Sequence, residues 1–450
     1  MITRVEVDGF KSLRGFAMDL EPFTVLIGPN SAGKSNVLEA LGLVSRLAFM
    51  PIAEAFKGGR GKAIDQFTRH GGKTTDAVRF AVELFLYGDY PPPPRRSKNG
   101  KDHHQSRFRY ELTIERRRLP SGAERLVARD ERLSVMRRED DSWMVRHPEL
   151  AACAGYRNGG DFLFVTLKNN SASAQEVVGL PTHWPEKVRT APTHTALTAA
   201  NYGVAHLVRE NLQLLRILGP ATAELGEASE RLDSGELNPS VSNLPSVLAE
   251  LPPNVLGEIR ADLVSLVPGI ASFEVTPERD EIRLDFELSG GDRLPARLVS
   301  AGTLRILALL TAIRAKPRAH MLCVEEPENG IYPGRMRAVL ELFKEVTGRS
   351  HEGDAQSALE EARSYKAQSV WTNQLPTQIL LTSHSPVALA TFRSRPEHVR
   401  FVDMVRRNGE RVTRVRTIRK GAVDDGGRST ISTREIDLLL DASGAVEPDE

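Results

Sequence analysis

Short apolar or alternating runs in the chain predict strands, and apolar residues spaced three or four apart predict helices. Residues 23–27 form an apolar run, which precedes a glycine-containing turn and a helical pattern over 36–47. After residue 300, a helix precedes an apolar strand at 320–324 and a further helix at 333–346. Other strands are expected at 78–87, 108–115, 125–136, 161–167, 270–275, 282–288 and 378–381. Strands that alternate with helices in this way predict an α/β fold.

The middle of the chain, from about Thr193 to Val267, has a helical period. Five apolar residues in its first part are expected on one side of a helix: Leu207, Val208, Leu212, Leu215 and Leu218. Pro239, Pro245 and the pair Pro252–Pro253 interrupt the pattern, because proline ends or kinks a helix. We therefore expect several short helices here, not one long arm.

The turn after the strand at 23–27 reads Gly28-Pro-Asn-Ser-Ala-Gly-Lys34-Ser35, which is the P-loop pattern G-x-x-x-x-G-K-S/T. The glycines let backbone N–H groups point at phosphate oxygens, next to the positive end of a helix dipole. Lys34 is expected to reach the β- and γ-phosphates, and the Ser35 hydroxyl to ligate Mg²⁺. The alternative is a glycine-rich turn without a ligand, but the strand before the pattern and the helix after it favour an ATP site.

The apolar run Met321–Val324 ends in two adjacent acids, Glu325 and Glu326. A buried parallel strand delivers such side chains at its C-terminal end, where α/β proteins bind ligands. Glu325 can hold Mg²⁺, while Glu326 can orient and deprotonate the attacking water. His384 follows the next apolar strand, where its imidazole could contact a γ-phosphate; a structural histidine is the alternative.

Composition and charge narrow the class of protein. The 450 residues are 40% hydrophobic and 26% charged, which is typical of a soluble globular protein, and no apolar run approaches the ~18 residues of a membrane span. The N-terminus lacks the apolar core of a signal peptide. Cys153 and Cys323 lie too far apart in sequence for a C-x-x-C metal motif, and two cysteines make no disulfide framework. A cytoplasmic protein without membrane contact is expected.

The net charge of +1 conceals a basic stretch. From Arg95 to Arg138 there are fourteen Lys and Arg residues against six Asp and Glu. Such a stretch suits the backbone of double-stranded DNA. A solvated, arginine-rich strand surface is the alternative.

Five segments together resemble an ABC-type P-loop ATPase of the RecF/SMC/OLD-like group. In that group's terms they are the opening strand motif, Walker A, the signature, Walker B with the D-loop, and the switch histidine. They are, in that order, 9–13, 26–36, 299–308, 324–330 and 381–386.

The resemblance assigns three sets of residues. The catalytic residues are Glu326 and His384, and the metal ligands of Mg²⁺ are Ser35, Glu325 and a Q-loop glutamine, for which Gln66 is the candidate. The ATP-binding residues are Lys11, Ser12, Gly28, Asn30, Ser31, Ala32, Gly33, Lys34, Ser35, Asn36, Ser300 and Gly302.

The signature residues Ser300 and Gly302 are expected to face the ATP that a second copy holds, so that two heads enclose two nucleotides. From sequence alone, Ser300 is simply a helix N-cap. An N-terminal helix dipole supplied by the partner would stabilise an anionic transition state. A homodimer is therefore expected.

The resemblance also implies a mixed-sheet ATPase head interrupted by a helical insertion. We expect head lobe I with Walker A and the basic segment at 1–175, and the insertion at 176–269. Lobe II, with the signature, Walker B and the switch histidine, is expected at 270–420, and a C-terminal tail at 421–450.

No Cys-x-x-Cys hook or long heptad arm occurs, and the 66 residues after His384 are too few for a TOPRIM nuclease domain. The resemblance then favours an ATP-driven sensor or scaffold for a separate effector, a nuclease or toxin, in bacterial anti-phage defence. One alternative is a RecF-like ATPase of DNA repair or recombination. Another is a module that holds a nucleotide without turnover.

Overall fold

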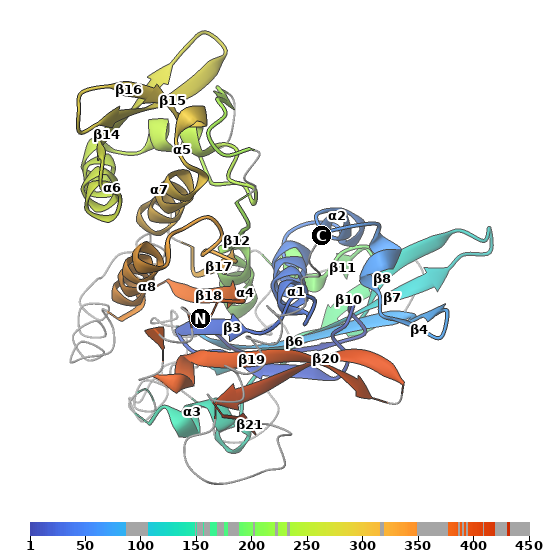
Figure 1. Cartoon of the computed structure of the whole chain (residues 1–450). Coiled ribbons are helices and arrows are strands. Elements are labelled where there is room, and N and C mark those ends of the chain that lie inside the picture. The colour runs from blue at the N-terminus through green and yellow to red at the C-terminus, as the bar shows by residue number, and fades with distance from the viewer. Residues whose placement is uncertain are drawn as a thin grey trace, which may run out of the picture.

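Two large sheets and a smaller, separate sheet organise the chain in a computed structural model (Figure 1). A membrane-spanning helix is not found in the part of the chain that the structure describes. The described residues are 1–86, 107–148, 150, 156, 163–168, 175–178, 189–200, 203–220, 224–231, 235–315, 319–348, 377–385, 388, 391–392, 395–407, 409–418 and 430–432.

The seven-stranded sheet holds the strands that precede the candidate motifs. Its first five strands run parallel, and β20 pairs antiparallel with β19. In spatial order the strands are β12 (Leu215–Leu218), β17 (Met321–Glu325), β18 (Gln378–Ser383), β3 (Phe23–Ile27), β19 (Val399–Arg407), β20 (Glu410–Ile418) and β21 (Thr430–Ile431). Nearly every residue of β3, β17 and β18 is buried, because helices and strands cover both faces, as is usual for parallel strands.

The eight-stranded sheet is antiparallel. In spatial order its strands are β11 (Arg189–Thr190), β10 (Gln175–Val178), β9 (Leu163–Lys168), β8 (Glu124–Val135), β7 (Arg107–Arg118), β6 (Ala77–Phe85), β1 (Ile2–Asp8) and β2 (Phe16–Asp19). The short strands β4 (Arg69–His70) and β5 (Lys73–Thr74) pair only with each other among the described strands.

The seven-stranded sheet separates two hydrophobic cores. Alternate side chains of its central strands point to opposite faces, so Cys323 and Leu380 join the core around α1, while Val324 and Leu381 join the core around α7 and α8. The helices are α1 (Lys34–Leu47), α2 (Ile52–Lys57), α3 (Ser142–Arg146), α4 (Gly203–Gln213), α5 (Leu244–Glu250), α6 (Pro253–Leu266), α7 (Ala301–Arg314) and α8 (Pro333–Gly348). Short 3-10 helices are η1 (Ala63–Gln66), η2 (Arg138–Asp140), η3 (Ala196–Ala199), η4 (Ala296–Leu298) and η5 (Pro396–His398).

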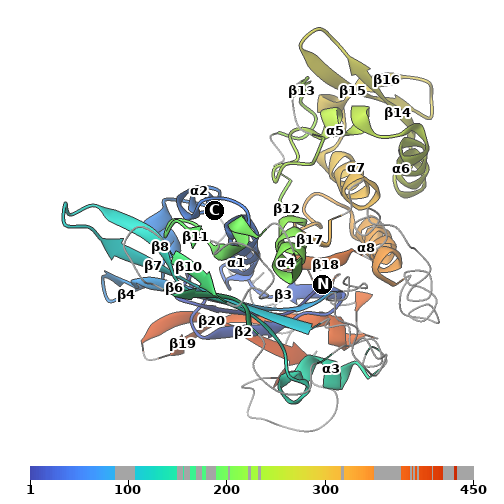
Figure 2. The same ribbon diagram turned by 180° about the vertical axis from the view of Figure 1, so that it is seen from behind.

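The smaller sheet stands away from the two large ones, together with α5 and α6 (Figures 1 and 2). Its strands are β13 (Ser229–Glu230), β15 (Glu281–Leu288), β14 (Ile270–Pro277) and β16 (Arg293–Pro295). Helix α6 packs against both α7 and β14, so this part joins the head through the helix that begins after Ser300.

The expected α/β fold is confirmed, and one part of the expectation for the middle of the chain is wrong. Helix α4 contains Leu207, Val208 and Leu212 as expected, but Leu215 and Leu218 lie on strand β12. A segment of four mostly apolar residues does not distinguish helix from strand by itself, and parallel pairing with β17 decides this one. Part of the range 176–269, strand β12, therefore lies within the seven-stranded sheet.

Candidate functional site

The candidate motifs meet at the C-terminal ends of three neighbouring inner strands of the seven-stranded sheet. Ile27 of β3 is in register with Ser383 of β18, and Thr382 of β18 is in register with Glu325 of β17. The C-terminal ends of these three parallel strands therefore lie level. The segments that follow them carry the P-loop, His384 and Glu326.

The P-loop has no room for side chains at its two motif glycines. A Cβ at Gly28 would lie 2.0 Å from the carbonyl oxygen of Val402 on β19, and a Cβ at Gly33 would lie 2.0 Å from Thr413 Oγ1 on β20. Gly33 also has a φ of +99°, and Ser31 one of +62°. The hairpin β19–β20 thus supports the loop in a left-handed conformation that glycine adopts without strain.

Lys34 is buried, and its ammonium lies within the loop. Nζ donates to the carbonyl oxygens of Gly28 at 2.7 Å and Pro29 at 3.0 Å. The N–H of Ala32 donates to Pro29 O at 3.3 Å and closes the turn. Burial lowers the pKa of Lys34, while the carboxylates of residues 325–328 act in the opposite direction. These carboxylates are therefore close enough to act on the lysine charge.

Polar side chains join the opening strand motif to the P-loop helix. Asn36 Nδ2 donates to Ser12 Oγ at 2.7 Å, and Ser12 Oγ lies 2.6 Å from Thr413 Oγ1. Asn30 and Ser31 are exposed at the tip of the loop. Their backbone is therefore accessible to a ligand, while Ser12 and Asn36 fix the base of the loop.

Ser35 and Glu325 can supply oxygen ligands to a cation. Ser35 Oγ donates to Glu325 Oε1, although the two residues are far apart in sequence. The described residues contain no cluster of three or more His, Cys, Asp or Glu that could hold a metal alone. One carboxylate and one hydroxyl fit Mg²⁺, which usually keeps several waters and completes its shell with substrate phosphates. Gly219, just after β12, leaves space beside this carboxylate, since a Cβ there would lie 3.2 Å from Oε2.

Gln66 has a structural environment. Its side chain is fully buried, and Nε2 donates to the carbonyl oxygen of Phe56 at 2.6 Å. None of its described contacts reaches Ser35 or Glu325. Its assignment as a metal ligand stays a prediction, and its position favours a role in holding the segment between α2 and η1.

Glu326 and His384 lie next to each other. Glu326 has a φ of +45°, and its N–H donates to both the carbonyl oxygen and Oγ1 of Thr382 at 3.1 Å. Asn329 Nδ2 donates to Glu326 Oε2 at 2.9 Å, and His384 Nδ1 lies 3.5 Å from Oε1. A left-handed conformation is unusual for glutamate and often marks a functional position.

Glu328 is a further acid at the site that the sequence analysis did not identify. Its Oε1 accepts from Ser383 Oγ at 2.6 Å and from the His384 N–H at 3.0 Å, and it lies 3.6 Å from His384 Nδ1. It therefore fixes the end of β18 and places His384 between two carboxylates. The sequence signal that could have identified Glu328 is its position two residues after Glu326.

Ser300 and Gly302 begin helix α7 beside the segment that follows β17. Ser300 Oγ accepts from the Thr303 N–H at 3.3 Å, so the N-cap expected from sequence is present. A Cβ at Gly302 would lie 2.2 Å from the carbonyl oxygen of Gly330. Arg305 Nη1 donates to the carbonyl oxygen of Glu326 at 3.2 Å and connects this helix to the catalytic candidate. Among the described residues, no hydrogen bond or ion pair joins Ser300 or Gly302 to the P-loop.

Lys11 also takes a left-handed conformation, with a φ of +47°. Its N–H donates to the carbonyl oxygen of Gln66 at 2.9 Å, and its Nζ pairs with Glu39 of helix α1. Lys11 is therefore held beside the P-loop helix.

Ion pairs engage much of the basic stretch. Residues 95–106 lie outside the described part of the chain. Arg107 is fully buried and pairs with Asp141, with a shortest contact of 2.6 Å. Further pairs in the described part of this stretch include Arg107 with Glu83, Arg109 with Glu6, Glu83 and Glu111, Arg116 with Asp76 and Glu124, Arg117 with Glu115, Arg129 with Asp130, and Arg137 with Glu139. In the described residues 107–138, a simple count of charges thus overstates the positive charge that the surface offers to a polyanion.

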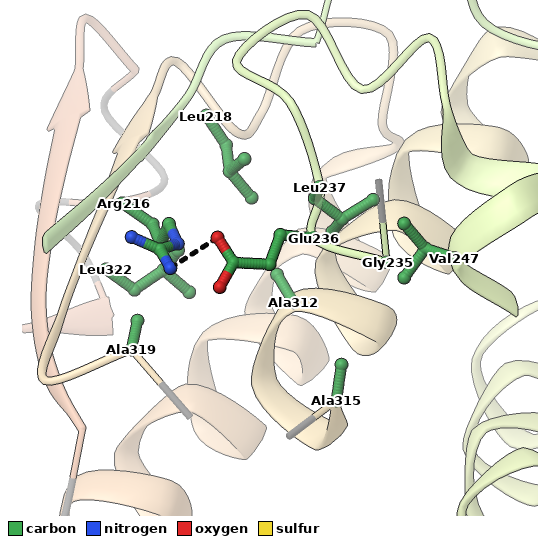
Figure 3. Close-up of a pocket in the computed structure, with 10 residues that line it drawn as sticks. All are labelled: Arg216, Leu218, Gly235, Glu236, Leu237, Val247, Ala312, Ala315, Ala319 and Leu322. Atoms are coloured by element: carbon green, nitrogen blue, oxygen red, sulfur yellow. Dashed lines mark hydrogen bonds and ion pairs between the residues drawn. The ribbon is translucent and has the colours of Figure 1, made fainter. Parts of the chain in front are cut away.

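A cavity of about 40 Å³ lies elsewhere, between β12, β17 and α7 (Figure 3). Arg216 and Glu236 pair across it at 2.5 Å. It has room for a few waters only, so it is no alternative nucleotide site.

Comparisons with known proteins found one similar curated protein and several similar solved structures. Structural maintenance of chromosomes protein 1 from Schizosaccharomyces pombe is 37% identical over 94 residues, which are 18% of this chain and 8% of that protein. The chain thus spans a small fraction of the length of this curated relative.

Solved SMC heads resemble the chain over most of its length, at low identity. The SMC head bound to the C-winged helix domain of ScpA is 12% identical with a TM-score of 0.46, over 92% of this chain and 98% of that one. The SMC head of Pyrococcus furiosus, bound to the C-terminal domain of ScpA, is 11% identical with a TM-score of 0.45, over 92% and 96%.

A family match covers residues 23–390, which include the P-loop, the signature segment, the Glu325–Glu326 pair and His384. It confirms a P-loop ATPase of the RecF/SMC group. The chain belongs to the family described as AAA domain, putative AbiEii toxin, Type IV TA system.

Proposed function

We propose that the chain hydrolyses ATP with the help of Mg²⁺, at the C-terminal ends of β3, β17 and β18. The observation that carries this proposal is the convergence of Lys34, Ser35, Glu325, Glu326 and His384 from three strands. These residues supply a cation for phosphate, two oxygen ligands for a metal, a base and an imidazole.

Each residue has a separate task in this proposal. Lys34 exchanges its bonds to loop carbonyls for bonds to the β- and γ-phosphate oxygens. Glu326, aimed by its left-handed backbone, orients the attacking water and takes its proton. His384 contacts the γ-phosphate, and Ser35 and Glu325 hold the metal. Bound Mg²⁺ would neutralise charge that develops on the phosphates.

The proposal is tested by measuring the phosphate that the purified chain releases from ATP. Lys34→Ala should weaken ATP binding itself, because the loop then lacks its phosphate-binding cation. Normal ATP affinity in Lys34→Ala would contradict the P-loop assignment. Binding without any turnover by the wild-type chain would favour the alternative of a nucleotide-holding module.

We further propose that two copies form the working enzyme, with Ser300 and Gly302 of each copy facing the ATP of the other. The two residues lack described hydrogen bonds to their own P-loop, which leaves the N-terminus of α7 available to a second copy. Ser300→Arg should bind ATP and fail to hydrolyse it. Mixing this variant with Lys34→Ala should restore part of the turnover, because one of the two composite sites is then intact. Normal hydrolysis by monomeric Ser300→Arg would exclude the shared site.

The biological role that we propose is a sensor or scaffold that drives a separate effector, a nuclease or toxin, in anti-phage defence. The family description, which names a toxin–antitoxin system, supports a role beside a partner protein. Proteins that co-purify with the tagged chain in an ATP-dependent manner would identify the effector. Replication or repair proteins in that sample would instead favour the repair ATPase.

A specific observation favours DNA contact as a second function. Arg406 and Arg411 lie directly opposite each other at the end of the hairpin β19–β20, and both are exposed, as is Arg407. No ion pair joins these three to an acid among the described residues. Like charges placed opposite each other destabilise a hairpin, so an anionic ligand would relieve them. The same hairpin supports the P-loop through Thr413.

Salt-dependent binding to double-stranded DNA tests this second function. Charge reversal at Arg406 and Arg411 should weaken binding and make it less dependent on salt, because fewer counterions are displaced. The matched control is charge reversal at residues 116–118, where Arg116 and Arg117 are already paired with acids. A larger effect at 116–118 would return the contact to the basic stretch. Absence of DNA binding at low salt would leave the effector role.

A further inference from the structure

Arg60 reaches the candidate metal ligand from a separate segment of the chain. It lies in the sequence Lys57-Gly-Gly-Arg-Gly-Lys62, between α2 and η1. Its Nη2 lies 2.6 Å from Glu325 Oε2, and its Nε lies 3.8 Å from Glu39 Oε1. The Arg60 side chain is 66% exposed, while that of Glu325 is 18% exposed.

Both oxygens of Glu325 are therefore engaged within the protein. Oε1 accepts from Ser35, and Oε2 pairs with Arg60. Glu39, which pairs with Lys11, approaches the same guanidinium at Nε. Positive and negative groups thus alternate from Lys11 through Glu39 and Arg60 to Glu325.

The segment that presents Arg60 has close contacts at its base. A Cβ at Gly58 would lie 2.7 Å from Arg46 Nε, and a Cβ at Gly59 would lie 2.8 Å from the amide of Gln66. Gly61 has a φ of +81°. The glycines let the backbone pack on the half-buried Arg46 and the buried Gln66, so these contacts set the direction of Arg60, while its guanidinium lies near the surface. This packing favours a structural role for the buried Gln66 side chain.

We propose that Arg60 and Mg²⁺ compete for Glu325. The inference rests on the proposed function, since it takes Glu325 as the metal ligand. A guanidinium and a divalent cation both draw on the same carboxylate, and Mg²⁺ needs it in an inner shell of near-octahedral geometry. Arg60 holds Glu325 when no metal is bound, and it moves to Glu39 or to solvent when ATP arrives with Mg²⁺. Arg60 thereby raises the Mg²⁺ concentration at which ATP binding is complete.

A binding titration tests this competition without using turnover. A fluorescent, non-hydrolysable ATP analogue is held at a fixed concentration, and Mg²⁺ is increased from an EDTA baseline. Arg60→Gln should lower the Mg²⁺ concentration at half-saturation by about two- to fivefold, the range expected for a solvent-exposed ion pair. Affinity in EDTA should not weaken. The matched control is Arg69→Gln, because Arg69 is an exposed arginine of the same region that pairs with Asp65.

The possible outcomes separate this inference from the proposed function. If Arg60→Gln weakens analogue binding both in EDTA and in Mg²⁺, Arg60 contacts the nucleotide and the competition is wrong. If Arg60→Gln and Arg69→Gln give the wild-type Mg²⁺ curve, the ion pair has no influence and the inference is also wrong. If the wild-type chain itself does not bind the analogue, or Lys34→Ala binds it normally, the proposed function fails instead.

Discussion

Replacing Gly302 with alanine should separate helix α7 from the segment that follows β17. The added Cβ would lie 2.2 Å from the carbonyl oxygen of Gly330 and 3.1 Å from its carbonyl carbon. Real Cβ atoms essentially never approach another heavy atom within 3.0 Å, so the helix or the segment must shift by about 0.8 Å. Both atoms belong to backbone, which cannot rotate away as a flexible side chain could.

The expected cost follows from two opposing effects. Forcing an extra methyl group into a packed contact costs about 1–3 kcal/mol. Alanine is better than glycine within a helix by about 0.5–1 kcal/mol, and by less in the first turn. A net loss of about 1–2 kcal/mol in the free energy of unfolding is therefore expected. The shift also displaces Arg305, which contacts the carbonyl oxygen of Glu326, so turnover should fall by up to ~10²-fold.

Urea unfolding without nucleotide, followed by ATP turnover, measures both effects. The matched control is Gly257→Ala in helix α6, where nothing lies within 4 Å of the added Cβ. That variant should be more stable than the wild type by about 0.5–1 kcal/mol. If Gly302→Ala loses turnover while its unfolding matches the wild type, the glycine serves only the ligand, and the packing argument is wrong.

Two further predictions concern buried charges outside the site. Arg107→Met should lower the free energy of unfolding by about 3–5 kcal/mol, because Asp141 would remain buried and charged. Urea unfolding measures this, with Arg125→Met, a change at an exposed arginine, as the control. Equal stabilities of the two variants would contradict the prediction. Burial raises the pKa of Glu131 from 4.5 to about 7, so the folded state holds this proton more tightly than the unfolded state. Its contribution to stability is present below about pH 4.5 and is lost as the pH rises to about 7, roughly 3 kcal/mol in total. Glu131→Gln should remove this part of the pH dependence of unfolding, and an unchanged dependence would refute the assignment.

The sequence predicted the core of the candidate site because its motifs are contiguous and their context is local. Apolar strands precede both the P-loop and the Glu325–Glu326 pair, and parallel strands align their C-terminal ends. Helix α1 begins at Lys34, two residues before the expected start, since a helix boundary depends on the preceding turn.

Contacts between segments that are distant in the chain could not be predicted from the sequence. Thr413 contacts Gly33, although the two residues lie near opposite ends of the sequence. Arg60 pairs with Glu325 from a glycine-rich segment that has no motif of its own. Strand β12 looked like part of a helix because its three apolar residues, Leu215, Ile217 and Leu218, fit either period, and only the pairing with β17 decides. The basic stretch is a related case, since the sequence counts its charges but does not show which acids pair with them.

Substitution of Glu326 by Gln tests the central claim most directly, with Glu341→Gln, an exposed acid of α8, as the control. The change keeps size and hydrogen bonding but removes the base. Glu326→Gln should bind Mg²⁺-ATP as tightly as the wild type and should hydrolyse it ~10²–10⁴-fold more slowly in single-turnover measurements. Glu341→Gln should match the wild type in both. Wild-type single-turnover hydrolysis by Glu326→Gln would contradict the account, because the proposed catalytic base would then be dispensable.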